Sequence, residues 1–380
     1  MRIAALLVLG AVPLVAQPDL YHPAIDYYGG PANDPVALLN GKVNLKFEGP
    51  SGYLRSVLEA LKIPVESQIA VFSKTSLQSP LIEPRNPRTI FFNDSVAVGW
   101  MRGGFIEIAA HDPKQGVKFY TLDQRPTDRP LFRQGKDCLR CHVGAATLET
   151  AGMVVGSIYT AGDGAPQLIY GGTAVDHRTP FEERWGGWYV TGASPSLRHL
   201  GNAVITPGGD PKAMEPLHGT VDSDVAALML FDHQMHMINL ITRIGWDTRA
   251  RMGKLQDSAQ ELVDYMLFVE EAPFAGKLES RFAPVFAKNG PRDSKGRSLR
   301  DLDLQKRLLR YPCSYMIYSE AFDALPAEAK DAIYKRIWQV LSGADKARKY
   351  SRLAAADRRA VIEILRETKK GIPDYFQVVK

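Results

Sequence analysis

The stretch GKDCLRCHVG, residues 135–144, contains the three side chains of this chain whose types and spacing most clearly suggest chemistry: Cys138, Cys141 and His142. Thiolates and imidazoles bind metals, and a Cys-x-x-Cys pair is also typical of thiol–disulfide exchange. A thioredoxin-like redox pair lacks the following histidine and begins a helix after a strand, whereas this motif follows the polar loop RPTDRPLFRQGKD. A zinc site needs a fourth ligand and usually a second cysteine pair, which the sequence does not offer. What this motif binds therefore depends on the cellular compartment of the protein and on its other cysteines.

The N-terminus MRIAALLVLGAVPLVAQ has one positive charge at Arg2, an apolar run over residues 3–16 and a polar continuation. This layout is typical of a signal peptide, which we predict over residues 1–17 with Ala16 as its last small residue. Leu14 does not fit the small-residue pattern before a cleavage site, so an uncleaved anchor is the alternative. Past residue 17 no apolar run approaches the roughly 18 residues that span a bilayer. We therefore expect a periplasmic or otherwise exported protein with no transmembrane segment in its mature chain.

The chain has three cysteines, and an odd count is a poor disulfide framework for an exported protein. The third, Cys313, lies in the apolar stretch RYPCSYMIY and is predicted to be a buried, inert thiol. In an exported chain, Cys-x-x-Cys-His favours covalent haem: the thiols form thioethers with the two vinyl groups, and the adjacent imidazole is the proximal iron ligand. We therefore predict one haem c, bound by Cys138 and Cys141, with His142 as the proximal ligand of the iron.

By this motif the chain resembles c-type cytochromes. The stretches RTIFFNDSVAVGW, RWGGWYVTG, RHLGN and YPCSYMIYSEAFDALP are also similar to exported bacterial proteins described only as cytochrome-c-domain proteins. That similarity covers most of the mature chain. The family has no settled activity, so the resemblance implies the haem and the compartment and says little about a reaction.

The amino-acid composition narrows the class of protein to which this chain can belong. The chain has 380 residues, of which 45% are hydrophobic and 23% charged, with a formal net charge of +5. These values are those of an ordinary soluble globular protein, and blocks of like charge are absent. We expect no nucleic-acid partner. A small cytochrome domain needs only about a hundred residues, so most of this chain must serve another purpose, such as catalysis, partner docking or sensing.

The pattern of apolar residues predicts an α+β fold in three parts, which together form either separate domains or one compact unit. Residues 18–130 are β-rich, with strand-like runs separated by turns. Residues 131–220 form the haem-attachment segment, with short strands and Gly-rich turns. Residues 221–380 are mainly helical.

Two helices are predicted with definite bounds. Residues 53–61 (YLRSVLEAL) have apolar residues at helical spacing within the β-rich part. The first helix of the C-terminal part is predicted from Ser223 to Arg243, capped by Asp222 or Ser223 and ended by Gly245.

The sixth ligand of the iron is predicted to be a histidine. His199 is the first choice because it lies in the Gly- and Pro-bounded loop SPSLRHLGN, where a side chain can be aimed at a cofactor. His233 is the second choice because it lies in the apolar helix LMLFDHQMHMINLI, where a buried imidazole needs a partner. The alternatives are a surface position for His199 and a hydrogen-bonded core position for His233. Weaker candidates are Met153, His177, His22 and His111.

Two functions from different classes follow. In the first, both axial positions of the iron are filled and the protein transfers electrons to a redox partner protein. In the second, the distal site is open and the protein is a haem-dependent oxidoreductase of peroxidase type. The single haem motif and the lack of a recognisable catalytic motif favour electron transfer, whereas the chain length favours an enzyme. A haem-based sensor or a structural subunit is a third possibility.

Overall fold

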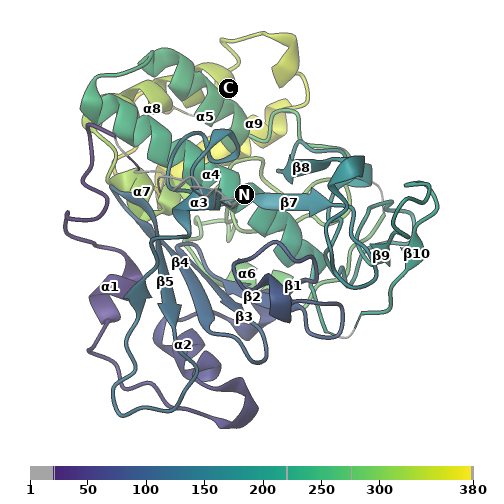
Figure 1. Ribbon diagram of the computed structural model, residues 1–380. Coiled ribbons are helices and arrows are strands. Elements are labelled where there is room, and N and C mark those ends of the chain that lie inside the picture. Colours follow the sequence, from purple (N-terminus) through teal and green to yellow (C-terminus); the bar gives the residue numbers. More distant parts are fainter. Residues whose placement is uncertain (1–19, 21, 220, 275, 378–380) are drawn as a thin grey trace, which may run out of the picture.

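The computed structural model describes residues 20, 22–219, 221–274 and 276–377. The predicted signal peptide, residues 1–17, lies outside this part of the chain. The α+β fold is confirmed: antiparallel strands dominate the N-terminal half and helices the C-terminal half (Figure 1). Among the described helices, none is both long and apolar enough to cross a bilayer.

A six-stranded antiparallel sheet forms the centre of the N-terminal half, with its strands in chain order from β1 to β6. Its strands are β1 (Ile69–Val71), β2 (Arg88–Phe92), β3 (Val96–Trp100), β4 (Ile106–Asp112), β5 (Gly116–Leu122) and β6 (Arg133–Gln134). Each strand pairs with its sequence neighbours, so the runs RTIFF, VAVGW, IEIAAHD and GVKFYTL form a meander. Successive side chains of each strand therefore alternate between two faces.

The two faces of this sheet pack against different parts of the molecule. One face carries Val98, Ile108 and Tyr120, which join a core cluster with Val36 of α1 (Pro35–Leu39) and Val57 of α2 (Leu54–Ala60). The helix predicted over residues 53–61 is thereby confirmed as α2. The opposite face contributes to a second, larger cluster that includes residues from Tyr27 to Phe376 and so draws on all three parts of the chain.

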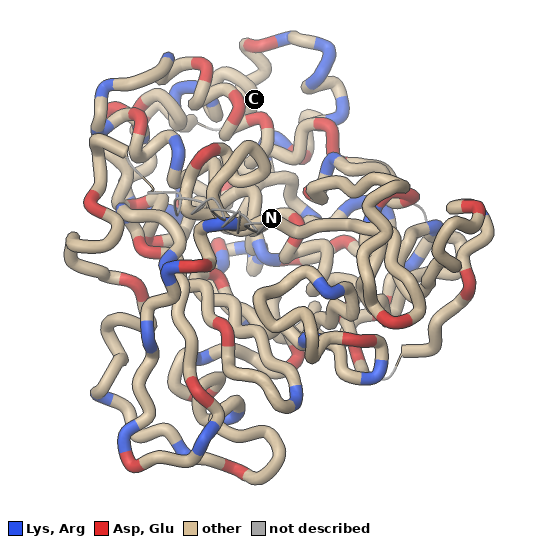
Figure 2. The backbone as a smooth tube through the Cα atoms, viewed as in Figure 1, with Lys and Arg blue, Asp and Glu red and all other residues tan. Residues whose placement is uncertain are grey.

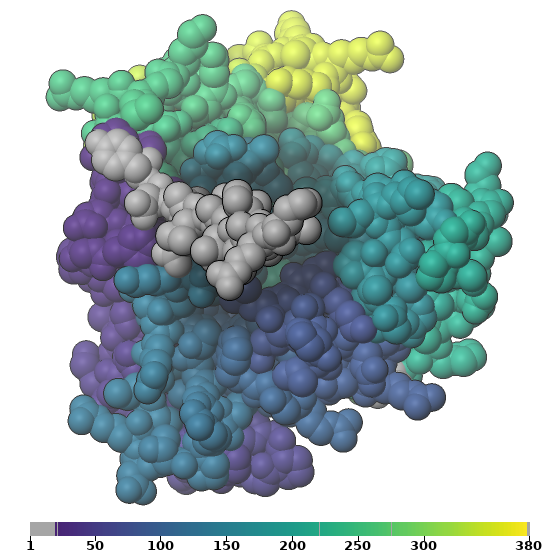
Figure 3. All heavy atoms as spheres, in the orientation of Figure 1, coloured from purple at the N-terminus to yellow at the C-terminus, as the bar shows by residue number. Residues whose placement is uncertain are grey.

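The middle of the chain contains short elements around the cysteine motif. They are α3 (Leu139–His142), the hairpin β7 (Val155–Ile158) and β8 (Gly172–Val175), and the pair β9 (Ala203–Val204) and β10 (Glu215–Pro216). In Figure 1 the hairpins lie beside the six-stranded sheet, and Figure 3 shows the N-terminal, middle and C-terminal segments abutting on this face.

The helical part is built around α4 (Val225–Ala250), which contacts β5, β7 and the helix α5 (Leu255–Met266). The others are α6 (Phe282–Lys288), α7 (Glu320–Asp323), α8 (Ala327–Leu341) and α9 (Ala355–Thr368). Asp224 caps α4 by accepting hydrogen bonds from the amides of Ala226 and Ala227. The predicted cap was therefore one or two residues early.

The predicted end of this helix at Gly245 was wrong, because α4 continues to Ala250. A Cβ atom at Gly245 would lie 3.1 Å from Leu325 Cδ2, so this glycine allows close packing against the segment just after α7 rather than ending the helix. Its neighbours Ile244 and Trp246 are both buried. Tertiary packing thus outweighs the low helix propensity of glycine here.

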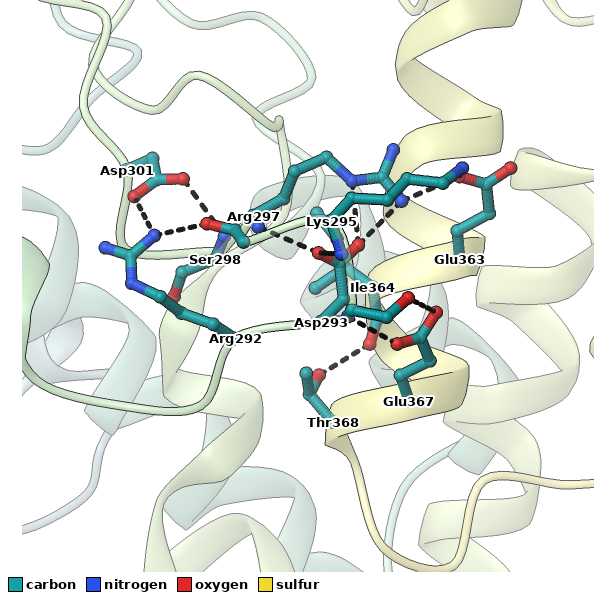
Figure 4. A network of polar contacts seen from close by, with 12 residues as sticks. Arg292, Asp293, Lys295, Arg297, Ser298, Asp301, Glu363, Ile364, Glu367 and Thr368 are labelled. Atoms are coloured by element: carbon teal, nitrogen blue, oxygen red, sulfur yellow. Dashed lines mark hydrogen bonds and ion pairs between the residues drawn. The ribbon is translucent and has the colours of Figure 1, made fainter.

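Charged residues of both signs are interspersed along the chain (Figure 2). Figure 4 shows one charged network, in which the segment 292–301 is tied to α9. Glu363 of α9 accepts from Lys295 at 2.8 Å and from Arg297 at 2.7 Å, and the amide of Ser294 donates to Glu367 at 2.6 Å. Such partly exposed pairs each stabilise a fold by about 0–1 kcal/mol.

Candidate haem-binding site

The cysteine motif forms a single helical turn directly after the sheet. The carbonyl of Cys138 accepts from the amides of Cys141 at 3.2 Å and His142 at 3.1 Å. Residues three and four apart lie on one side of a helical turn, so this local structure places both cysteines and the histidine along the same side of the turn. The turn is short, since α3 ends at His142.

The two cysteines are free thiols in different surroundings: Cys138 is half-buried and Cys141 is exposed. Burial raises the pKa of the Cys138 thiol to about 11. A thiol-exchange cysteine needs a lowered pKa and a thiolate near neutral pH, so this environment is unfavourable for a redox-active pair. Cys313 is fully buried, as predicted, and burial raises its pKa to about 12.

His142 is held in one orientation by the backbone. Its Nδ1 lies 3.0 Å from the carbonyl oxygen of Gly152, and because a carbonyl only accepts, Nδ1 must carry the proton. Nε2 is then the unprotonated nitrogen. Burial lowers the pKa of the imidazole to about 4, so it is neutral at neutral pH, the form that binds metals. The ring of Phe119 packs beside it, with centroids 4.6 Å apart.

Cys138, Cys141 and His142 line one cavity of about 410 Å³. This volume lies within the roughly 300–1,000 Å³ of small-molecule and cofactor sites. The sheet face that borders the cavity carries small residues at its centre, namely Ala97, Gly99 and Ala109, whereas the opposite face carries large ones at the alternating positions. Small residues on one face of the pleat thus leave space for a flat molecule beside the motif. The other walls come from β7, Trp188 and Phe231.

A second, larger groove of about 760 Å³ borders the ends of the central strands and contains Trp100, Arg125 and Arg133. It shares Phe105 and Thr121 with the smaller cavity but contains none of the three motif residues. By volume alone this groove would be the candidate cofactor site. The cysteines and the histidine that could bind a cofactor, however, line the smaller cavity.

The polar side of the smaller cavity is an ion pair on the sheet. Arg88 of β2 donates to Glu107 of β4 at 2.8 Å, and Glu107 also accepts from Ser76 at 2.6 Å and Gln78 at 3.1 Å. The sequence prediction did not include Arg88 or Glu107. The signal was a charged residue near the start of each of the mainly apolar strands RTIFF and IEIAAHD, on the face that borders the cavity.

The structure places the two predicted sixth ligands away from this cavity. His233 is fully buried in α4, with Nδ1 2.8 Å from His177 Nδ1 and Nε2 2.7 Å from Ser314 Oγ. His199 packs against Trp185, with ring centroids 5.5 Å apart, and burial lowers its pKa. Neither residue is part of the cavity lining. The sixth-ligand prediction therefore gains no support from placement and stays a prediction.

Of the weaker candidates, one lies at the cavity and the others do not. Of these, Met153 lines the cavity, His111 bonds Thr242 at 3.1 Å, and His22 lies 3.7 Å from Asp247. Among the described residues that line the cavity, His142 is the only histidine and Met153 the only methionine.

The donor set contains the groups that covalent haem would need. Within the described part of the chain, no group of three or more His, Cys, Asp or Glu side chains is arranged to hold a metal ion. A haem c would use two thiols for attachment and one neutral imidazole with an unprotonated Nε2 as iron ligand, beside a cavity. Cys138, Cys141 and His142 would hold it.

Comparison with known proteins identifies no relative: no protein-family model, no curated protein and no solved structure matches this chain. The resemblance to c-type cytochromes therefore depends on the residues of the motif and on the stretches quoted above.

Proposed function

We propose that this protein is a periplasmic or otherwise exported c-type cytochrome that carries one haem c and transfers electrons to or from a redox partner protein. The observation that supports this most is the geometry at His142, where a backbone carbonyl holds the protonated Nδ1 and leaves Nε2 unprotonated in a residue that lines one cavity with both cysteines. When bound, the haem supplies a reversible one-electron centre. The protein's own residues would attach it, orient the imidazole and supply a cavity lining of apolar residues and one ion pair, which would set its potential.

The cysteines provide the direct test. Protein produced with a periplasmic haem-attachment system should keep its haem through acid-acetone extraction and denaturing electrophoresis. Replacing both motif cysteines, Cys138→Ala with Cys141→Ala, should abolish this retention completely, because no thioether can form. Cys313→Ala is the matched control, since this thiol is buried elsewhere and should not affect attachment. Haem that washes out of the unmutated protein, or a colourless protein that carries zinc, would contradict the proposal.

A second candidate function, a haem-dependent oxidoreductase of peroxidase type, is favoured by the cavity lining. The described lining residues include no second histidine but do include the Arg88–Glu107 pair, a cation and a carboxylate that could handle a bound small molecule and its protons. In the electron-transfer protein the sixth position of the iron would be filled by a protein ligand, whereas in the oxidoreductase it would be open to a small molecule.

Optical spectra of the ferric and ferrous protein, with and without carbon monoxide, separate the two functions. For a closed site the ferric protein should be low-spin and the ferrous protein should not bind carbon monoxide. A high-spin protein that binds carbon monoxide rapidly would exclude the closed-site proposal and select the oxidoreductase.

A further inference from the structure

The segment that follows the cysteine motif is fixed between His142 and the helix α4. The amide of Gly152 donates to the carbonyl of His142 at 3.0 Å, while the carbonyl of Gly152 accepts from His142 Nδ1 at 3.0 Å. The next residue, Met153, is held on both of its backbone groups by Asn239 of α4. Its amide donates to Asn239 Oδ1 at 3.1 Å, and its carbonyl accepts from Asn239 Nδ2 at 2.7 Å. The side chain of Asn239, 86 residues further along the chain, thus fixes the backbone of Met153, next to the Gly152 carbonyl that accepts from His142.

Gly152 is required by this close approach. A Cβ atom at this position would lie 2.1 Å from Asn239 Oδ1 and 3.2 Å from Thr147 Cβ, so no larger residue fits without displacing the amide of Asn239. The lack of a side chain at Gly152 thus allows the loop to approach α4 closely. The paired hydrogen bonds at Met153 then hold the Gly152 carbonyl, which orients His142, in that position.

Asn239 itself is 1% exposed in the middle of a 26-residue helix. A buried amide that is left unpaired destabilises a fold, and here both its oxygen and its nitrogen are paired with one residue of the loop. A purely structural role would explain the pairing. However, Met153 directly follows Gly152, whose carbonyl accepts the hydrogen bond from His142. The pairing with Asn239 therefore also holds this carbonyl in place.

We propose that Asn239, acting through Met153 and Gly152, is a positioning residue that sets the Nδ1–H···O bond of His142 and thereby the basicity of the iron ligand. This inference depends on the proposed haem attachment. A histidine that donates from Nδ1 becomes a stronger donor through Nε2, and such outer partners alter metal affinity by about 10–100-fold. A stronger donor favours ferric over ferrous iron, so the clamp should lower the reduction potential.

The test compares two asparagines that make the same pair of bonds. Asn239→Leu removes the clamp on Met153. Asn202 clamps Val190 in the same way, with its oxygen 2.8 Å from the amide and its nitrogen 2.7 Å from the carbonyl, but Val190 does not line the cavity. Asn202→Gly removes those bonds and suits the positive φ of 59° at this position, so it serves as the matched control.

Asn239→Leu holoprotein should keep its covalent haem. Its electron-exchange equilibrium with a reference couple should change about threefold to tenfold in favour of the ferrous form, a rise of about 30 to 60 mV for a one-electron couple. The Asn202→Gly holoprotein should keep the potential of the unmutated protein. An unchanged potential in Asn239→Leu, or an equal shift in both variants, would overturn the inference while leaving haem attachment intact.

Two further measurements keep the inference testable should Asn239→Leu fail to fold. Asn239→Ser is smaller than the native residue and loses the same amide pair, so its potential should move in the same direction. In the unmutated holoprotein, NMR should detect a slowly exchanging proton on His142 Nδ1, and rapid exchange of that proton would overturn the inference. Failure of the unmutated protein to retain haem would instead overturn the proposed function and this inference with it.

Discussion

Two histidines, the partly buried His142 at the end of α3 and the fully buried His233 in α4, show how different two imidazoles of lowered pKa can be. Burial lowers the pKa of both, to about 4 and about 3. His142 uses one ring nitrogen, on the Gly152 carbonyl, and borders a cavity. His233 uses both ring nitrogens, on His177 and Ser314, and is 0% exposed.

The difference teaches that burial alone does not identify a metal ligand. A neutral imidazole can bind iron only through a nitrogen whose lone pair is free. At His142 the backbone takes the proton-bearing nitrogen and leaves the other available. At His233 both nitrogens are taken by side chains, so the residue stabilises the packing of α4 against its neighbours.

Replacing each histidine should separate these roles, with the largest effect at His142. In His142→Gly the haem should remain attached through the cysteines but its absorption spectrum should change completely, because the proximal ligand is lost, and added imidazole should restore it. In His233→Ala the spectrum should be unchanged. Its free energy of unfolding should fall by about 2–4 kcal/mol, because a cavity forms and the partners His177 and Ser314 lose a hydrogen bond.

Absorption spectroscopy and denaturant titration of both holoproteins measure these outcomes. Conversion of His233→Ala to a high-spin, carbon-monoxide-binding form would show that His233 is the sixth ligand after all and that the bonds described here rearrange when haem binds. The same result in His199→Ala would identify the first-choice ligand.

A smaller effect is expected from pH. Desolvation lowers the pKa of His233 from 6.5 to about 3, while Asp176 acts to raise it and His236 to lower it further. The unfolded chain therefore binds a proton below pH 6.5 that folded His233 does not bind. The stability contributed by the neutral His233 is present above pH 6.5 and is lost as the pH falls toward 3, by up to about 1.4 kcal/mol per pH unit for one proton.

His233→Asn, which cannot titrate, should show a shallower loss of stability over this pH range. Denaturant titrations at several pH values between about 6.5 and 4 provide the comparison with the unmutated protein. Parallel curves for the two proteins would mean that His233 becomes protonated without unfolding and that the buried pair with His177 is not maintained.

Much of the fold was predictable because its signals are local. The β-branched and aromatic residues of RTIFF and VAVGW, between turn residues, predicted strands, and these residues form β2 and β3 of the sheet. The end of α4 was not predictable, because the glycine signal at Gly245 is local whereas the reason for the glycine, close contact with Leu325, is not. The cavity was likewise hidden, since Ala97 and Ala109 look like ordinary strand residues until the register places them together.

The sequence by itself determined the candidate attachment motif, because residues three and four apart, here Cys138, Cys141 and His142, lie on one side of a single helical turn. Tertiary structure alone decided which nitrogens are free. His233 meets Ser314 across 81 residues, and Asn239 meets Met153 across 86. Such pairings depend on how α4 packs against distant loops, and no spacing rule encodes them, because a side chain's hydrogen-bond partners are set by three-dimensional proximity rather than by position in the chain.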